Sequence, residues 1–363
     1  MSFLKKIFNT KEEPINNYND FWNWFQKNEK AFLKVLKGNG DIENDFFNKL
    51  SPKLNELREG YYFLTGMMND NTAELVLTAD GVIKNIVFVE ELVNAAPVIE
   101  SWKFTALKPA LGIEDVTIKM ADYIFSKDEL SFYYNEDSNF PDEIDITVIH
   151  NDLNEENRDI VTNGTYIFLD NFLGELNFAT TIDNIYVIGK DKVEKELIPI
   201  EKLKDFLIWR EKEFVEKYSG TRHNTENDRY SMLEAQIEGG KPLVAVINTD
   251  LLSWDSKASH PWILAIEARF LSDENGMPND IILQKLSDLE EDIMNQLPDV
   301  DGYLNIGRET ANSTRNLYFA CKDFRKPSKV AEDLIGSYDD RFIISFEIYK
   351  DKYWQSFNRF VGN

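Results

Sequence analysis

The sequence is poor in the residues that hold disulfides and transition metals. Among 363 residues there is one cysteine, Cys321, and there are three histidines, His150, His223 and His260, which lie far apart along the chain. A lone cysteine excludes an intramolecular disulfide, and the histidines have no partners at the spacing of a metal site. We therefore expect no metal site in this chain.

Positive charge and long apolar runs are also scarce. The chain has 40 lysine and arginine residues against 64 aspartate and glutamate residues, so its formal net charge is −24 with histidine neutral. Such an acidic surface repels phosphate backbones. No apolar run approaches the roughly 18–20 residues that cross a membrane, and the first residues lack the apolar core of a secretory signal. We expect a cytoplasmic protein that binds neither nucleic acid nor membrane.

Common catalytic and cofactor-binding motifs are missing. The sequence has no Gly-x-Ser-x-Gly motif, residues 302–307 lack the Lys-Ser/Thr of a phosphate loop, and Gly38-Asn39-Gly40 lacks the third glycine of a dinucleotide site. Cys321 falls on the apolar side of its predicted strand, so it is expected to be buried and inert. We assign no catalytic residue and no cofactor.

One group of acidic residues leaves an alternative open. Glu290, Glu291 and Asp292 lie on a predicted helix, largely opposite its apolar stripe, which predicts a solvated face. A glycosidase with paired carboxylates is the alternative, because the distance between two carboxylates depends on the tertiary structure. Nothing else in the sequence favours it.

The length predicts two or three domains at ~150 residues per domain. Residues 1–60 are predicted to be helical and to pack on a first α+β domain at 61–218, which ends in an amphipathic helix over 200–218. The polar segment 219–228 is the best linker candidate. A second domain is then expected at 229–363.

The second domain has a distinctive order of predicted elements. They are strand 262–271, helix 279–297, strands 303–310 and 315–322, helix 328–335 and strand 341–349. This order, β-α-β-β-α-β, is that of a ferredoxin-like sandwich. A β-hairpin around Gly239-Gly240, with Ala235 opposite Val244, is expected before it and a short helix after it. The first domain has a similar order, so the predicted class is α+β with tandem two-layer sandwiches.

Two arginines are expected to converge at the tip of the hairpin 303–322. Closing its loop at 311–314 pairs Thr310 with Arg315, Arg308 with Leu317, Ile306 with Phe319 and Leu304 with Cys321. This register puts Arg308 and Arg315 on the helix-covered face, where they and Thr310 form a candidate site for a carboxylate or phosphate group. The alternative is that both arginines only pair with Glu309, Asp301 or a helix-end carbonyl.

Aromatic and charged residues are expected together on the opposite face of the same sheet. They are Tyr303, Tyr318, Tyr349, Glu267 and Arg269, joined by Glu347. RNA-recognition motifs place aromatics on such a face, but the segment 315–320 lacks their glycine and the acidic charge opposes RNA binding. We interpret this face as covered by the Gly239-Gly240 hairpin or by a protein partner.

Short motifs in the last third carry a family resemblance. In order they are Gly240-Lys241-Pro242, Gly276-Met277-Pro278, Leu289-Glu290-Glu291-Asp292, Gly307-Arg308-Glu309-Thr310, Arg315, Tyr318 and Asp351-Lys352-Tyr353-Trp354. From about residue 230 onward the chain resembles the bacterial domain of unknown function 695 family, which implies no established activity. Phe357 departs from the expected tyrosine. In topology and acidity the chain is also faintly similar to the regulator of ribonuclease activity B, an inhibitor with an α+β sandwich.

Two functional hypotheses follow. The first is a non-enzymatic binding or regulatory protein whose acidic surface engages a basic protein partner, because long-range attraction speeds such encounters. The second is an enzyme or sensor for an anionic small molecule bound near Arg308 and Arg315; a deep pocket where two domains meet favours it, whereas a flat acidic surface favours the first. The sequence leaves the oligomeric state open.

Overall fold

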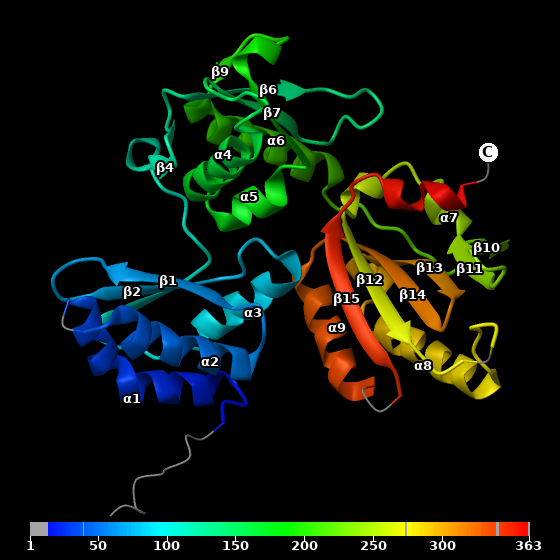
Figure 1. Ribbon diagram of the computed structural model, residues 1–363. Coiled ribbons are helices and arrows are strands. Elements are labelled where there is room, and N and C mark those ends of the chain that lie inside the picture. The colour runs from blue at the N-terminus through cyan, green and yellow to red at the C-terminus, as the bar shows by residue number, and fades with distance from the viewer. Residues whose placement is uncertain (1–13, 39, 273, 339–340, 362–363) are drawn as a thin grey trace, which may run out of the picture. The chain divides into compact units, whose positions relative to one another are not determined.

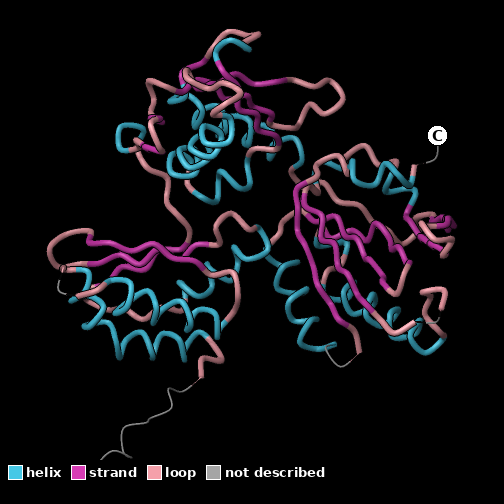
Figure 2. The backbone as a smooth tube through the Cα atoms, in the orientation of Figure 1, coloured by secondary structure: helices cyan, strands magenta, loops and turns pink. Residues whose placement is uncertain are grey.

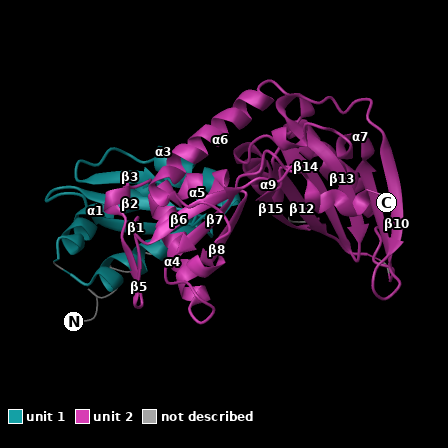
Figure 3. Cartoon of the chain, turned by 90° about the horizontal axis from the view of Figure 1, so that it is seen from above, with its two compact units in different colours: residues 1–109 teal, residues 110–363 magenta. Residues whose placement is uncertain are grey.

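The computed structural model describes residues 14–38, 40–272, 274–338 and 341–361. It combines helices with several small sheets, so the predicted α+β class is confirmed. The chain forms two compact units, residues 1–109 and 110–363 (Figure 3). This division differs from the boundary expected at 219–228, because the strands between residues 61 and 218 belong to three separate sheets.

The first unit contains one small sheet and the N-terminal helices. Its elements are α1 (Tyr18–Leu36), η1 (Glu43–Phe47), α2 (Asn48–Leu57), β1 (Tyr62–Met67), β2 (Ala73–Thr78), α3 (Ile83–Asn94) and β3 (Trp102–Ala106). The strand order is β1-β2-β3. β1 and β2 are antiparallel, and α3 connects β2 to the parallel strand β3.

Aromatic side chains form the core of this unit. Phe21, Phe25 and Phe32 of α1 are buried, and the Phe25 ring meets Trp102 of β3 edge-on with ring centroids 5.0 Å apart. The indole N–H of Trp22 donates to the carbonyl of Leu92 at 2.7 Å. Figure 2 shows α1 and α2 along one face of the sheet. The helical N-terminal segment therefore packs on residues 62–106, while residues 1–13 lie outside the described part of the chain.

The second unit begins with residues 110–218, which we call the middle part and which contain a two-stranded and a four-stranded sheet. Its elements are η2 (Ile113–Asp115), β4 (Ile118–Met120), β5 (Tyr123–Phe125), β6 (Leu130–Asn135), β7 (Asp145–His150), α4 (Arg158–Leu173), α5 (Glu175–Thr181), β8 (Asn184–Gly189), η3 (Lys190–Lys192), β9 (Ile198–Pro199), η4 (Ile200–Lys202) and α6 (Leu203–Tyr218). The four-stranded sheet has the order β8-β7-β6-β9, with β7 and β8 parallel, and β4 and β5 form the two-stranded sheet. Ile146 and Val148 of β7 pack with Phe168 and Phe172 of α4 in its core.

The C-terminal part (residues 229–363) is built on a six-stranded antiparallel sheet. Its elements are β10 (Tyr230–Gln236), β11 (Pro242–Asn248), α7 (Thr249–Leu252), η5 (Lys257–Ser259), β12 (Trp262–Arg269), α8 (Asp280–Gln296), η6 (Asp299–Asp301), β13 (Tyr303–Ala311), β14 (Thr314–Cys321), α9 (Arg325–Tyr338), β15 (Ile343–Lys350) and η7 (Gln355–Phe360). The sheet order is β10-β11-β13-β14-β12-β15. The predicted element order from β12 to β15 is the one observed.

This sheet has two different faces. Figure 1 shows α8 and α9 together on one side, which we call the helix face. Leu317, Ile266 and Phe346, neighbours across three strands, are buried there. The other side, the opposite face, has its own core, in which Ile263 and Ala320 pack with Trp354 and with Phe357 of η7. Buried on both faces, the central strands form the rigid base for the side chains described below.

A β-bulge at Gly307 corrects part of the predicted hairpin register. Arg308 opposes Leu317 and Thr310 opposes Arg315, as predicted, but before the bulge Asn305 opposes Phe319 and Tyr303 opposes Cys321. The predicted pairs of Ile306 with Phe319 and of Leu304 with Cys321 are therefore wrong. Gly307 has φ +143°, and a Cβ there would lie 2.2 Å from the Val246 carbonyl oxygen, so the bulge requires glycine.

The hairpin at Gly239-Gly240 is also one residue out of the predicted register. Ala235 opposes Leu243, not Val244, because the turn is closed by the bond from the Ile237 N–H to the Lys241 carbonyl. Both glycines have positive φ. The hairpin forms the outer strands of the sheet, so it does not cover a face of that sheet. The expectation that this hairpin covers the face with the tyrosines is therefore wrong.

We predict that Gly307→Ala lowers the free energy of unfolding by roughly 2–4 kcal/mol, because the new methyl group would collide with the β11 backbone. Gly336→Ala is the matched control. Gly336 lies inside α9, not at its end as its sequence position suggested, and has open space around its Cβ position. The Gly336→Ala substitution should raise the free energy of unfolding by about 0.5–1 kcal/mol. Urea unfolding followed by circular dichroism measures both, and equal midpoints would contradict the prediction.

Candidate functional site

The three residues predicted to bind an anion lie together on the helix face. Arg308 and Thr310 are on β13 and Arg315 is on β14, and the Arg315 Nε donates to Thr310 Oγ1 at 2.9 Å. Nη1 of Arg308 lies 2.9 Å from Oε2 of Glu290 on α8. The predicted convergence is therefore present, together with an ion pair whose acidic partner differs from the alternatives that the sequence suggested.

Two polar side chains in this cluster have buried atoms without a hydrogen-bond partner. Arg315 is 4% exposed, and its Nη1 has no hydrogen-bond partner. Oδ1 of Asn305 has no partner either, although Nδ2 of the same side chain donates to Glu290 at 2.9 Å. Burial, and then the nearby Arg308 charge, lower the pKa of Arg315 to about 10. Arg308 alone is shown paired with Glu290, and with two guanidinium groups and one carboxylate the cluster keeps an excess of one positive charge.

The sequence interpretation missed Glu290 and Asn305. Glu290 was expected on a solvated face, but it is 7% exposed, because it lies beside Leu286 and Ile293 on the flank of α8 that meets β13. Its position three residues before Ile293 could have shown this. Asn305 was hidden by the bulge, which no pattern of alternation predicts.

The predicted tyrosine surface is partly wrong. Tyr303 lies on the helix face, is 4% exposed and donates its hydroxyl to Asp323 at 2.7 Å, because the bulge reverses its side. Tyr318 and Tyr349 are on the opposite face as expected. They are covered by the chain's own η7, where Tyr318 packs edge-on against Phe357 and Tyr349 meets the hydroxyl of Ser356.

Glu267 and Arg269 pair with each other on that face, with Nε and Oε1 2.7 Å apart. Arg269 is well exposed and Glu267 about one-third exposed in its side chain. Since η7 already occupies the two tyrosines, these five residues do not form one surface. Partner binding at this face stays a prediction for the charged pair only.

A second candidate site lies where the middle and C-terminal parts of the second unit meet. A cavity of about 310 Å³, which we call the junction cavity, is bounded by α5 and α6 on one side and by the ends of β12, β14 and β15 on the other. Its lining residues are Ile144, Leu176, Asn177, Thr180, Thr181, Glu211, Phe214, Val215, Pro261, Trp262, Lys322, Asp323, Phe324, Arg325, Lys350 and Lys352.

Two lysines in this cavity share one carboxylate. Nζ of Lys350 lies 2.8 Å from Oδ1 of Asp183, and Nζ of Lys352 lies 2.7 Å from Oδ2 of the same residue. Lys350 also donates to the Thr181 carbonyl, and Lys352 to that of Asp142. Burial lowers the pKa of Lys350 to about 8; Asp183 opposes the shift and Lys352 adds to it.

A second acidic residue fastens the same junction. The carboxylate of Asp142, in the middle part, accepts hydrogen bonds from Lys217, Tyr218 and Tyr353 at 2.6–2.9 Å. Burial alone would raise the pKa of Asp142, but these three donors outweigh it and hold the pKa below its usual value. The walls of the junction cavity are therefore fixed by charge-assisted hydrogen bonds, which are stronger than neutral ones.

The cavity carries more positive than negative side chains. Its lining contains Lys322, Arg325, Lys350 and Lys352 against Glu211 and Asp323, and Asp183, which is bonded to both Lys350 and Lys352, adds a third negative charge beside it. Asp323 accepts from the hydroxyl of Tyr303 and from the backbone N–H of Arg325 at the start of α9, so its charge is already used in the fold. An anion entering the cavity would meet this excess of cations.

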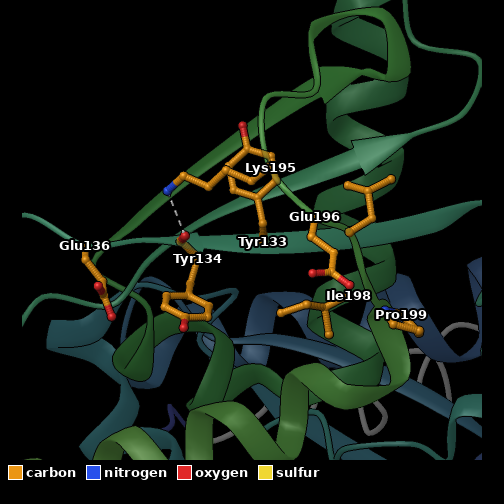
Figure 4. A pocket seen from close by; sticks show the side chains of 8 residues that line it. Tyr133, Tyr134, Glu136, Lys195, Glu196, Ile198 and Pro199 are labelled. Atoms are coloured by element: carbon orange, nitrogen blue, oxygen red, sulfur yellow. Dashed lines mark hydrogen bonds between the residues drawn. The ribbon is translucent and has the colours of Figure 1, made fainter.

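Another hollow, of about 700 Å³, lies along β6 and β9 (Figure 4). Its one lysine, Lys195, donates to the Tyr134 carbonyl and to Asn135, and two glutamates, Glu136 and Glu196, line it as well. Its charged groups sum to one negative charge. It therefore offers an anion less than the junction cavity does.

Comparison with known proteins identifies only the last third of the chain. Residues 231–361 match the family model described as "Family of unknown function (DUF695)". The predicted resemblance is confirmed over this range. No curated protein matches, and no solved structure matches either. The ferredoxin-like assignment and the similarity to the regulator of ribonuclease activity B therefore stay predictions.

The described residues contain neither a cluster suited to a metal ion nor a helix that could span a membrane. Among residues 14–38, 40–272, 274–338 and 341–361, histidine, cysteine, aspartate and glutamate form no group of three that could hold a metal ion. In the same part of the chain, each helix is too short or too polar to cross a bilayer. Cys321 is buried, as predicted, and burial raises the pKa of its thiol.

We predict that Asp183→Asn lowers the free energy of unfolding by about 3–5 kcal/mol, because it removes the charge shared by two largely buried lysines. Glu216→Gln is the matched control. Its ion pair with Lys212 spans 3.8 Å between exposed side chains, so the change should be within about 0.5 kcal/mol. Urea unfolding followed by tryptophan fluorescence measures both. A small effect of Asp183→Asn would show that the junction does not depend on this carboxylate.

Proposed function

We propose that the second unit binds a small anionic molecule in the junction cavity, as a binding or regulatory module. The observation that carries this proposal is the single carboxylate, Asp183, shared by Lys350 and Lys352 at the cavity wall. A largely buried cation without its own counter-charge raises the energy of the folded state. A bound anion would supply that charge.

The size and lining of the cavity support the same class of ligand. At about 310 Å³ it is at the small end of ligand pockets. Trp262, Phe324 and Phe214 add aromatic surface beside the cations, so a carboxylate or phosphate attached to a flat or apolar body would be bound by both. This cationic lining contrasts with a chain whose net charge is −24.

The proposal changes the place of the anion site and keeps its chemistry. Arg308 and Arg315 were predicted to hold the anion together, but Arg315 is 4% exposed and Nη1 of Arg308 is held by Glu290, so only the remaining N–H groups of Arg308 are open to a binding partner. The lysines of the junction cavity lie at other strand ends. We favour binding over catalysis, because Lys350 and Lys352 are held by Asp183 and by backbone carbonyls. A basic protein partner stays a prediction.

Thermal unfolding with anionic probes tests the proposal. We expect inorganic phosphate, citrate or AMP to raise the Tm of the full-length protein by about 3 °C or more. Lys322→Ala, at an exposed position, and Lys350→Met should each reduce the shift. Lys195→Ala, in the other hollow, should leave it unchanged. If no probe shifts the Tm, or if both cavity variants respond like the wild type, the proposal is wrong.

The affinity for an anion should depend on pH. Lys350 titrates near pH 8, well below its ordinary pKa of 10.5, and its protonated form attracts the ligand. Affinity should therefore fall roughly tenfold between pH 7 and pH 9. Isothermal titration with the stabilising anion at both values measures it, and Lys350→Met should remove most of the dependence.

Without ligand, the contribution of Lys350 to the stability of the protein should change with pH in the direction opposite to the affinity for the anion. Because the folded state lowers the pKa of Lys350, the unfolded chain binds more protons between pH 8 and pH 10.5. The contribution of this group to stability must therefore rise with pH across that window. An affinity that rises together with stability would contradict the assignment of Lys350 to the binding site.

A further inference from the structure

The helix face of the C-terminal sheet is only partly covered. α9 packs on β15 and β12, and Glu290 of α8 is hydrogen-bonded to Asn305 and Arg308 of β13. Six strands thus lie over two helices. Within the part of the chain that the structure describes, the outer pair, β10 and β11, has no helix on this face, since Met232 is 66% and Tyr230 48% exposed.

Strand register identifies the side chains on this uncovered strip. Met232, Val246 and Arg308 oppose one another in a row across β10, β11 and β13, and the row continues into the buried Leu317. Opposed residues of antiparallel strands project to the same face. Val244, in the next row, opposes Thr310 and is half-buried like Val246. The centre of the strip is therefore apolar; it ends at Arg308 on one side, and Glu234, which opposes Val244, lies at its outer edge on β10.

The flank of α8 forms the wall of the strip. Leu283 and Met294 are 43% and 42% exposed, and they stand seven residues before and four residues after Glu290, which places all three on one side of the helix. The Met294 sulfur lies 3.4 Å from Nδ2 of Asn305, so this side of α8 faces β13. Between this wall and the exposed β10 lie the apolar side chains of the strip, and we call this surface the groove.

The charge at the base of the groove is positive. Arg308 and Arg315 carry two charges against one on Glu290, and the Glu290 bond uses only Nη1 of Arg308. A guanidinium group has five N–H donors, and the Arg308 side chain is 35% exposed toward the groove. The nearest like-facing acid on β10 is Glu234, which is exposed at the outer rim. The groove therefore complements an acidic side chain set in an apolar surface.

We propose that this groove docks an amphipathic α-helix of a partner protein, whose apolar side covers β10 and β11 and whose carboxylate pairs with Arg308. Two strands are about 10 Å wide, which is the diameter of one helix, so the docked helix would lie beside α8 as a third member of the helix layer. This site uses other elements than the junction cavity and is independent of it.

A helix fits this surface better than an extended strand or a lipid does. Strand addition to β10 would leave Val244 and Val246 uncovered, since an added strand lies beyond the edge and not on the face. A lipid chain needs an enclosed apolar channel, whereas this groove is open along β10. An amphipathic helix buries the floor and the wall together and keeps its polar side in water.

Binding of designed peptides to the full-length protein tests the proposal. The probe is a fluorescein-labelled helix of about 16 residues, which matches a seven-residue strand of roughly 23 Å. It carries a leucine stripe bordered by glutamates, and a second probe has lysine in place of each glutamate. By fluorescence anisotropy the glutamate helix should bind at least about tenfold more tightly than the lysine helix.

Variants distinguish the groove from other apolar surfaces. Met232→Glu should abolish binding, and Arg308→Met should remove the preference for glutamate without abolishing binding. Ile343→Glu is the matched control, because Ile343 is 74% exposed on β15 at the other edge of the sheet. It should change nothing.

Several results would overturn the proposal. They are equal affinity for the two peptides, no binding of either one, and weakening by Ile343→Glu as large as that by Met232→Glu. A measurement of the oligomeric state by light scattering could also overturn the proposal. If the wild-type chain is a dimer that Met232→Glu converts to a monomer, the groove is occupied by a second copy and not by a helix of another protein.

Discussion

The contact of Asp183 with Lys350 and Lys352 joins two separately formed sheets into one compact unit. Asp183 directly precedes β8 in the middle part, and the lysines lie at the end of β15 and just after it. Because charge-assisted bonds depend strongly on geometry, they fix how the strand ends face α5 and α6. The junction cavity exists as a consequence, and so does the excess of positive charge on its wall.

Much of the C-terminal part could be predicted from the sequence. Alternation of apolar residues along β12 and β15 identified both strands and the face they share, since two faces of one strand see different surroundings. The pairing of Arg308 and Arg315 with their neighbours at the hairpin tip was right for the same reason. Alternation fails at Gly307, where one extra residue exchanges the faces and moves Tyr303 beneath α9.

The candidate site was harder to predict, because its residues come together only in the tertiary structure. Lys352 and Asp183 are 169 residues apart in the chain, and no short motif contains both. The linker expected at 219–228 separated them in the sequence interpretation as well. Glu290 shows a different difficulty. Its charge suggested exposure to solvent, but a single acidic residue at the flank of an apolar stripe can be buried when an arginine pairs with it, as Arg308 does here.

The position of these lysines in the chain has a consequence for biosynthesis. During translation the middle part leaves the ribosome complete, with Asp142 and Asp183 exposed, while the residues that bind them are still to be added. Lys352 follows Asp183 by 169 residues, and Tyr353 follows Asp142 by 211 residues. The nascent polypeptide can therefore fold its first sheets early, but the junction cavity closes only after β15 and the residues that follow it have been synthesised.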